Sequence, residues 1–190
     1  TEMYLGGTFG STVTGTANVL MAAVLAKGKT VIENAACEPE VQDLANFLSK
    51  MGAKIKGIGT PRLEIDGVKS LKGATHTVIP DRIETGTFIT AGALLGGSIT
   101  IKNCRLDHLA AVIDKYKDMG VAVRKISDTE CRVSKSRSLN PVDIATLPYP
   151  GFPTDMQAQA MVLLSIADGI SVITEKIYPD RFMHIAELNR

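Results

Sequence analysis

The chain has 190 residues, of which 45% are hydrophobic and 22% are charged, a balance typical of a soluble globular protein. Its 21 basic and 20 acidic side chains give a formal net charge of +1, which excludes a global field that would recruit nucleic acid or an anionic membrane. The three cysteines, Cys37, Cys104 and Cys131, lack metal-ligand spacing, and no apolar segment approaches the roughly 20 residues that span a bilayer. We therefore expect a cytosolic protein with reduced thiols and no redox or zinc chemistry.

The first predicted unit opens with a short strand at residues 3–5 and an apolar helix at residues 19–25. After a turn at Gly28, a strand at residues 30–32 and a turn at Asn34, a second helix is expected over residues 39–51, with Gly52 as its C-terminal cap. Alternating apolar residues at Leu63 and Ile65, and then Val78, predict the strands that follow.

The second unit repeats this order with a helix at residues 91–95, a strand at residues 99–101 and a helix at residues 106–119. The turn residues of the two units correspond in register: Gly28 with Gly97, Asn34 with Asn103, and Gly52 with Gly120. We infer an internal repeat of small α/β units, each with two helices on mixed strands, that dock against one another.

A third unit begins at Thr154 with a helix over residues 156–167, a turn at Gly169 and a strand at residues 171–173. Its second helix is expected to start near Arg181, and the chain stops before that helix is closed. We therefore expect a piece of a longer protein. The charged segment at residues 80–84 is the expected boundary between two lobes, residues 1–79 and residues 80–190.

Hydroxyls and glycines gather at three expected helix starts: residues 14–16, residues 85–87 and the segment from Thr154. Free backbone N–H groups at such positions can bind anions or hydroxyl-rich ligands, although a threonine N-cap and a tight glycine turn explain the same pattern. Thr154 and Gln157 have the spacing of a capping box, which would hold Asp155 at the mouth of a buried helix. There the helix dipole favours a carboxylate by roughly 0.3 to 1 kcal/mol.

Two charged residues keep more than one interpretation. Asp155 either carries chemistry or only decorates a helix start, since acidic first turns are common. Arg181, expected at the start of a helix where the dipole disfavours a cation, serves either a ligand anion or an ion pair with Asp155 or Asp180.

Seven segments taken together resemble, in the right order, successive blocks of the enolpyruvyl transferase family, and most closely its members that use UDP-N-acetylglucosamine: residues 11–16, 33–36, 38–40, 51–55, 80–87, 152–159 and 181–184. The resemblance implies an α/β (α+β) fold of repeated βαβαββ-like units, an inside-out α/β barrel that is incomplete here. It also implies that the whole protein transfers the enolpyruvyl group of phosphoenolpyruvate to the 3'-hydroxyl of UDP-N-acetylglucosamine for peptidoglycan synthesis. No cofactor and no metal are implied.

The resemblance assigns roles to individual residues. Asp155 falls on the proposed general base that engages the sugar hydroxyl. Other positions would bind substrate: Ser11, Thr12, Val13 and Thr14 at the UDP moiety, Thr154 and Ile177 at the sugar nucleotide, and Arg181 where it would help to neutralise anionic substrate. Thr14 departs from the family pattern, because a glycine is usual at that position.

Some parts of the family's active site have no counterpart in these residues, namely the mobile loop with its reactive cysteine or aspartate and a Lys-Asn pair. The three cysteines do not lie in such a loop, so we expect the 190 residues alone to have no turnover. Two alternatives stay open: a shikimate-3-phosphate enolpyruvyl transferase, and a non-catalytic module that kept the repeat. Apolar faces left without their neighbours would favour self-association.

Overall fold

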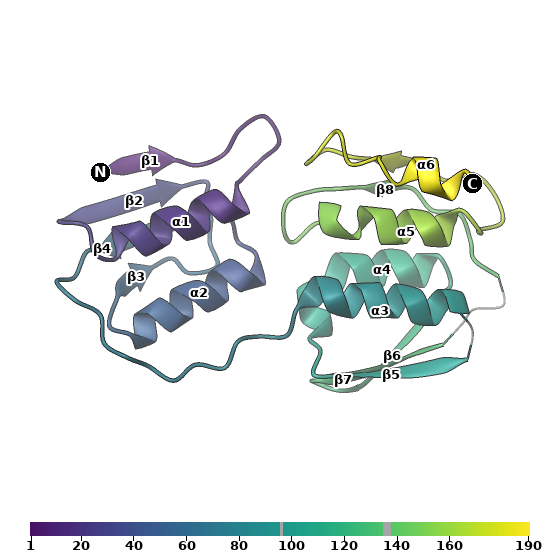
Figure 1. Cartoon of the computed structure of the whole chain (residues 1–190), viewed down its shortest axis with the longest axis horizontal. Coiled ribbons are helices and arrows are strands. Elements are labelled where there is room, and N and C mark those ends of the chain that lie inside the picture. The colour runs from purple at the N-terminus through teal and green to yellow at the C-terminus, as the bar shows by residue number, and fades with distance from the viewer. Residues whose placement is uncertain (96, 135–137) are drawn as a thin grey trace. The chain divides into compact units, whose positions relative to one another are not determined.

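A computed structural model describes residues 1–95, 97–134 and 138–190 of the chain. These residues form two compact units, Thr1–Ile79 and Pro80–Arg190 (Figure 1). The division falls at Pro80, where the sequence analysis expected a lobe boundary, and the assignment of the units to two lobes stays a prediction.

The first unit has the element order β1 (Glu2–Tyr4), α1 (Val13–Ala23), β2 (Lys29–Glu33), α2 (Pro39–Lys50), β3 (Lys54–Lys56) and β4 (Arg62–Asp66). Its four strands form one sheet in the order β1-β2-β4-β3, in which β1 and β2 are parallel and the other pairs antiparallel. Leu20 of α1 is fully buried with Ile32 and Ile65 from the sheet, so the helix packs its apolar side onto the strands. This order is the βαβαββ unit expected from the sequence.

The second unit begins with α3 (Arg82–Leu95), β5 (Ser98–Lys102), a short 3₁₀ helix η1 (Leu106–Leu109), α4 (Ala110–Asp118), β6 (Ala122–Ser127) and β7 (Glu130–Ser134). It continues with β8 (Ile144–Ala145), a 3₁₀ helix η2 (Thr154–Met156), α5 (Gln157–Leu164), β9 (Ile173–Thr174) and α6 (Ile185–Leu188). Strands β5, β7 and β6 form an antiparallel sheet, whereas β8 and β9 form a parallel pair. In Figure 1 the helices α3, α4 and α5 lie between that sheet and that pair.

The backbone confirms the internal repeat. Asn34 and Asn103, the two non-glycine residues with positive φ in the described chain, have φ of 57° and 52° and each follows the strand after the first helix of its unit. Asparagine tolerates the left-handed region better than most residues, which explains its place at both turns. The parallel unit β8-α5-β9 also has the connectivity of β1-α1-β2.

Two expected helix starts are wrong, because helices α1 and α3 begin earlier than predicted. The hydroxyl of Thr12 accepts a hydrogen bond from Gly15 N, and Asp81 Oδ1 accepts from Ile83 N, so these residues cap the helices. Residues 85–87 therefore lie inside α3, and in residues 14–16 the N–H groups of Gly15 and Thr16 already donate to Thr12, so neither segment offers the run of free N–H groups that was expected.

Two other expectations are wrong in the second half of each unit. Val78 belongs to no strand and is 74% exposed. Arg181 lies in a turn, since the last helix begins at Ile185, so the argument about an arginine at a helix start does not apply to it.

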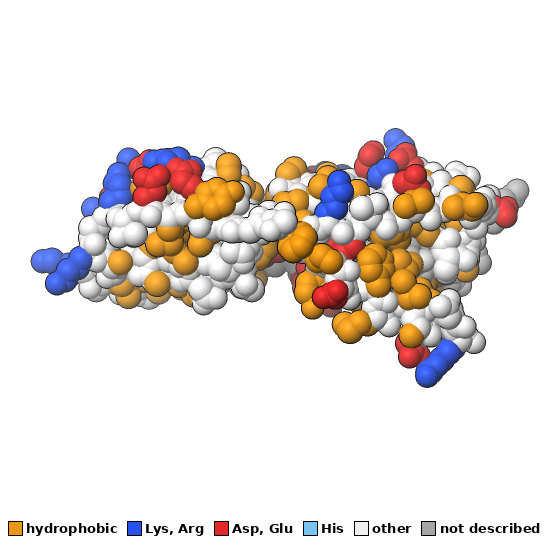
Figure 2. All heavy atoms as spheres, turned by 90° about the horizontal axis from the view of Figure 1, so that it is seen from above, with side chains coloured by type: hydrophobic (Ala, Val, Ile, Leu, Met, Phe, Trp, Pro, Cys, Tyr) orange, Lys and Arg blue, Asp and Glu red, His pale blue; other side chains and the backbone are white. Residues whose placement is uncertain are grey.

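Apolar side chains remain exposed on the C-terminal part of the second unit. Among them are Ile166, Ile170, Val172 and Met183, and Figure 2, which looks onto this side, shows hydrophobic groups between charged ones. Such a patch is compatible with self-association, which stays a prediction. Among the described residues, no helix is long and apolar enough to cross a membrane.

Candidate functional site

Asp155 lies at the start of the helical segment made of η2 and α5. Pro153 precedes it in an extended conformation with φ of −73° and ψ of 138°, which prevents a helix from running in from upstream. The Asp155 side chain is 50% exposed, and its neighbour Met156 is fully buried in the core. The carboxylate therefore projects from a rigidly packed helix start into solvent, where the free N–H groups of the first turn favour an anion.

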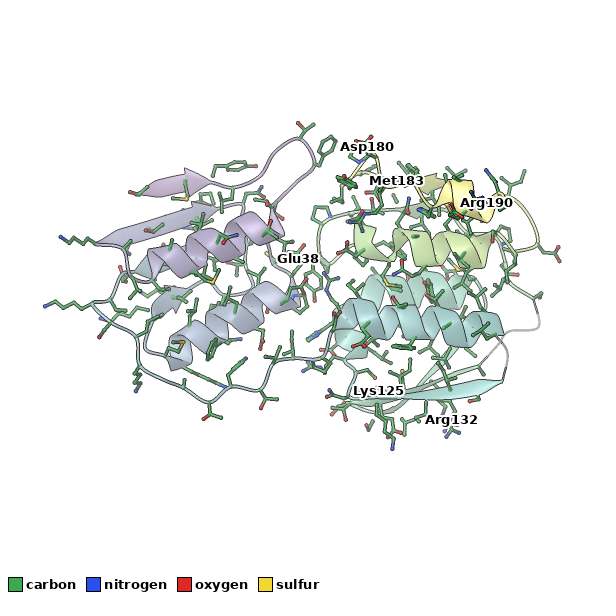
Figure 3. The ribbon with its side chains drawn as sticks, viewed as in Figure 1. Glu38, Lys125, Arg132, Asp180, Met183 and Arg190 are labelled. Carbon is green, nitrogen blue, oxygen red and sulfur yellow. The ribbon has the colours of Figure 1, made fainter. Side chains whose placement is uncertain are left out.

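Arg181 meets Asp155 across 26 residues of sequence. Its Nη1 donates a hydrogen bond of 2.5 Å to Asp155 Oδ1, and its guanidinium lies 5.6 Å from the ring centroid of Tyr178. The arginine side chain is 35% exposed. Figure 3 shows Asp180 and Met183, which flank this arginine in the sequence, in the C-terminal segment beside α5. The structure thus confirms the ion-pair alternative for Arg181, and both members of the pair remain accessible to a ligand.

The predicted capping box between Thr154 and Gln157 is wrong. The Thr154 hydroxyl donates to Glu175 Oε2 at 2.9 Å and takes no part in a cap. The side chain of Gln157 is fully buried, and neither its amide oxygen nor its nitrogen has a hydrogen-bond partner among the described residues. The buried helix start is therefore held from outside, through Glu175, and not by its own side chains.

Glu175, for which no role was predicted from the sequence, accepts four hydrogen bonds on one carboxylate. Oε1 accepts from the hydroxyl of Thr146 at 2.6 Å, from Ile177 N at 2.8 Å and from Tyr178 N at 2.9 Å, while Oε2 accepts from Thr154. The hydroxyl of Thr146 in turn accepts from the backbone N–H of Lys176 at 2.8 Å. This Glu175 clamp joins the end of β8, the start of the α5 segment and the turn that leads to Arg181.

The Glu175 carboxylate is held in its charged form. Partial burial opposes ionisation, but the hydrogen bonds from Thr146, from the Tyr178 and Ile177 amides and from Thr154 outweigh it and keep the pKa of Glu175 below its ordinary value. A charged acceptor also makes these bonds stronger than bonds between neutral groups.

The clamp decides which backbone group Ile177 can present to a ligand. Its N–H is already donated to Glu175, so the group that remains is the carbonyl oxygen, which accepts hydrogen bonds. A ligand at Ile177 would therefore have to offer an O–H or N–H group.

Residues 11–14 lie in the first unit at the start of α1. Thr12 is the N-cap of this helix, and Val13 is its first residue. Ser11 is half-buried and Thr14 is exposed, with its carbonyl accepting from the Asn18 side chain at 2.8 Å. The hydroxyl of Thr12 already accepts a hydrogen bond from Gly15 N. A ligand at this helix start would therefore meet the hydroxyls of Ser11 and Thr14. The helical backbone at position 14 accommodates a threonine, since it needs no positive φ there.

A protein-family model described as EPSP synthase (3-phosphoshikimate 1-carboxyvinyltransferase) matches residues 8–190. The chain belongs to the EPSP synthase family. A solved structure agrees with this assignment. The enolpyruvyl transferase NikO from Streptomyces tendae superposes with a TM-score of 0.84 at 28% identity, over 93% of this chain and 42% of that one. The expected enolpyruvyl transferase fold is thereby confirmed.

Curated relatives within the EPSP synthase family carry the name UDP-N-acetylglucosamine 1-carboxyvinyltransferase. The protein of Thermodesulfovibrio yellowstonii is 56% identical over 180 residues, which are 94% of this chain and 43% of the relative. The protein of Methylacidiphilum infernorum is 52% identical over all 190 residues, which are 45% of the relative. A protein of Caldanaerobacter subterraneus subsp. tengcongensis is 57% identical over 94% of this chain and 43% of the relative. The chain thus spans less than half the length of the curated relatives it matches.

The three cysteines of this EPSP synthase family member lie away from Asp155 in the sequence and are buried or half-buried. Cys104 and Cys131 are buried with their sulfur atoms 3.8 Å apart, and burial raises the pKa of Cys131 to about 12. Cys37 is half-buried, and burial followed by the charge of Glu38 raises its thiol pKa as well. In the described part of the chain, no three His, Cys, Asp or Glu side chains are grouped so as to hold a metal ion.

Proposed function

We propose that this chain carries the sugar-nucleotide side of an enolpyruvyl transferase. The whole protein would transfer the enolpyruvyl group of phosphoenolpyruvate to the 3'-hydroxyl of UDP-N-acetylglucosamine, with release of phosphate, to make a peptidoglycan precursor. The support is the name shared by curated relatives that are 52–57% identical over 94–100% of this chain. The observation on which the mechanism rests is the exposed Asp155 carboxylate at a rigid helix start, paired with Arg181.

In this proposal Asp155 accepts the proton of the sugar hydroxyl as the oxygen bonds to the enolpyruvyl carbon. A charged, fixed and accessible carboxylate can do so, and such a general base contributes typically 10²- to 10⁴-fold to a rate. Arg181 orients the carboxylate through Oδ1 and adds positive charge for an anionic substrate. The Ile177 carbonyl would accept a hydrogen bond from the sugar nucleotide.

The UDP moiety would contact residues 11–14 of the first unit. Ser11 and Thr14 supply hydroxyls, Thr12 supplies its capped backbone, and Val13 gives an apolar surface. Thr154 would act on substrate through its neighbour Asp155, since its own hydroxyl is donated to Glu175.

The test is a phosphate-release assay on the longer natural protein that contains these residues. We expect turnover with phosphoenolpyruvate and UDP-N-acetylglucosamine, and none with shikimate 3-phosphate as acceptor. Turnover with shikimate 3-phosphate alone would favour the sibling activity, and no turnover with either acceptor would favour a non-catalytic module. The 190-residue chain alone is expected to release no phosphate, and release by it would contradict that part of the proposal.

A further inference from the structure

The Glu175 clamp is bonded to the two backbone segments that carry Asp155 and Arg181. One of its donors, Thr154, is the residue before Asp155, and the two amide donors, Ile177 and Tyr178, begin the turn that carries Arg181. Tyr178 also places its ring under the Arg181 guanidinium. Both partners of the ion pair are therefore tied through short backbone segments to the same carboxylate.

The hydrogen bonds of the clamp run from the buried core to the exposed segments. Thr146, which is fully buried, anchors Glu175 to the end of β8, and it also accepts from Lys176 N. The core thus fixes the carboxylate, and the carboxylate fixes the two exposed segments on which Asp155 and Arg181 lie. The ion pair alone is too exposed to set their spacing, because such pairs contribute little in water.

We propose that Glu175 is a positioning residue, whose carboxylate holds the Thr154–Asp155 segment and the segment from Ile177 to Arg181 at the spacing in which Asp155 meets the acceptor hydroxyl. This inference rests on the proposed function. In this arrangement Glu175 acts through the protein, since Oε1 accepts from three protein donors and Oε2 accepts from Thr154.

The charge of the Glu175 carboxylate strengthens all four bonds of the clamp. Glutamine has the size of glutamate but carries one acceptor oxygen and one NH₂ donor group. In Glu175→Gln the amide oxygen can keep the three donors of Oε1, and the Thr154 hydroxyl can turn to accept from the NH₂ group, so a neutral hydrogen bond replaces the bond to a charged oxygen. The substitution therefore weakens the link to Thr154 and Asp155 and leaves the rest of the clamp in place.

The experiment compares Glu175→Gln, Thr154→Val and the double variant in the longer natural protein, with Glu187→Gln as the control. Glu187 is an exposed glutamate paired with Arg190, outside the clamp. We expect Glu175→Gln to lower kcat about 10- to 100-fold, because misplacement of a catalytic group by about 1 Å has effects of that size. The KM for phosphoenolpyruvate should stay within about twofold, and the control should keep kcat within about twofold.

The double variant separates positioning from a general loss of structure. If Glu175 acts through Thr154, the double variant should lose no more activity than the more damaged of the two single variants, since both changes act on the same bond. A Glu175→Gln variant with kcat within twofold of the wild type would overturn the inference, as would a loss that multiplies fully with that of Thr154→Val.

A second measurement does not depend on turnover. In the 190-residue chain, amide hydrogen exchange followed by NMR should show Ile177 and Tyr178 protected, with at least tenfold faster exchange after Glu175→Ala. Rapid exchange of the Ile177 and Tyr178 amides in the wild type would contradict their hydrogen bonds to Glu175. If the wild-type longer protein turns over no substrate, the proposed function fails, and the exchange measurement still decides whether Glu175 holds this segment.

Discussion

Arg181 Nη1 lies 2.5 Å from Asp155 Oδ1, although 26 residues of sequence separate them. The pair joins the turn after β9 to the start of the α5 segment and leaves both side chains partly exposed. An exposed ion pair of this kind contributes little to stability.

Asp155→Asn should abolish most activity of the longer natural protein without unfolding it. The amide cannot accept the hydroxyl proton, so we expect kcat to fall about 10²- to 10⁴-fold. The free energy of unfolding should change by less than about 1 kcal/mol, because the pair with Arg181 is solvent-exposed. Phosphate release and urea unfolding measure the two effects.

The matched control for that substitution is Asp107→Asn. Asp107 also lies in the first turn of a 3₁₀ helix and accepts from an arginine, Arg105, at 2.6 Å. It should keep kcat within about twofold, since an exposed pair outside the site contributes little. Equal losses in both variants would show that Asp155 has no special part in the reaction.

Stability should depend on pH through Glu175. Its pKa is lower in the folded protein than the ordinary 4.5, so the carboxylate contributes stability above about pH 4.5 and loses that contribution as the pH falls through the folded pKa. The difference in unfolding free energy between the wild type and Glu175→Gln should therefore shrink between pH 6 and pH 3. Urea unfolding at several pH values checks this, and a difference that grows toward low pH would contradict the lowered pKa.

Tyr116→Phe should destabilise the second unit. The Tyr116 hydroxyl is buried 2.7 Å from the hydroxyl of Thr90, which also donates to Gly86 O at 2.9 Å. Removal of the phenol oxygen takes one partner from Thr90 and leaves a small void, at a cost of about 1 to 2 kcal/mol in denaturant unfolding. Tyr4→Phe, at a residue that is 71% exposed, is the control and should stay within about 0.5 kcal/mol.

The left-handed backbone conformation of Asn103, which matches that of Asn34 in the first unit, can be tested by substitution. With φ of 52°, it should accept glycine with a change within about 1 kcal/mol, whereas Asn103→Val should cost about 2 kcal/mol or more because a β-branched residue is strained there. Thermal unfolding of the two variants measures the contrast. Equal stability of the valine and glycine variants would show that the left-handed turn is not required.

Much of the fold could be predicted from local sequence. The strands around Val31 and Ile99, the helix from Pro39 and the paired turns at Asn34 and Asn103 lie where the sequence analysis expected them. These features depend on backbone preferences and on apolar spacing within a few residues, which a single sequence displays directly. The helix starts were less certain, because Thr12 and Asp81 compete as caps with the polar residues that follow them.

Only part of the candidate site could be predicted from the sequence. Asp155 and Arg181 could be singled out by residue type and resemblance, and their pairing was one of the alternatives considered. The role of Glu175 was not predicted: an acidic residue before a turn is a weak local signal, and its partners Thr154 and Thr146 lie 21 and 29 residues away.

The repeat and the α/β class could be predicted from the amino-acid sequence, because both depend on turn residues and apolar spacing within short segments. What holds Asp155 in place depends on contacts between segments that are distant in the sequence. The donors that surround Glu175 come from three separated segments, and no local preference specifies that a hydroxyl will turn toward a distant carboxylate and not cap its own helix. That choice depends on the packing that brings β8, α5 and β9 together.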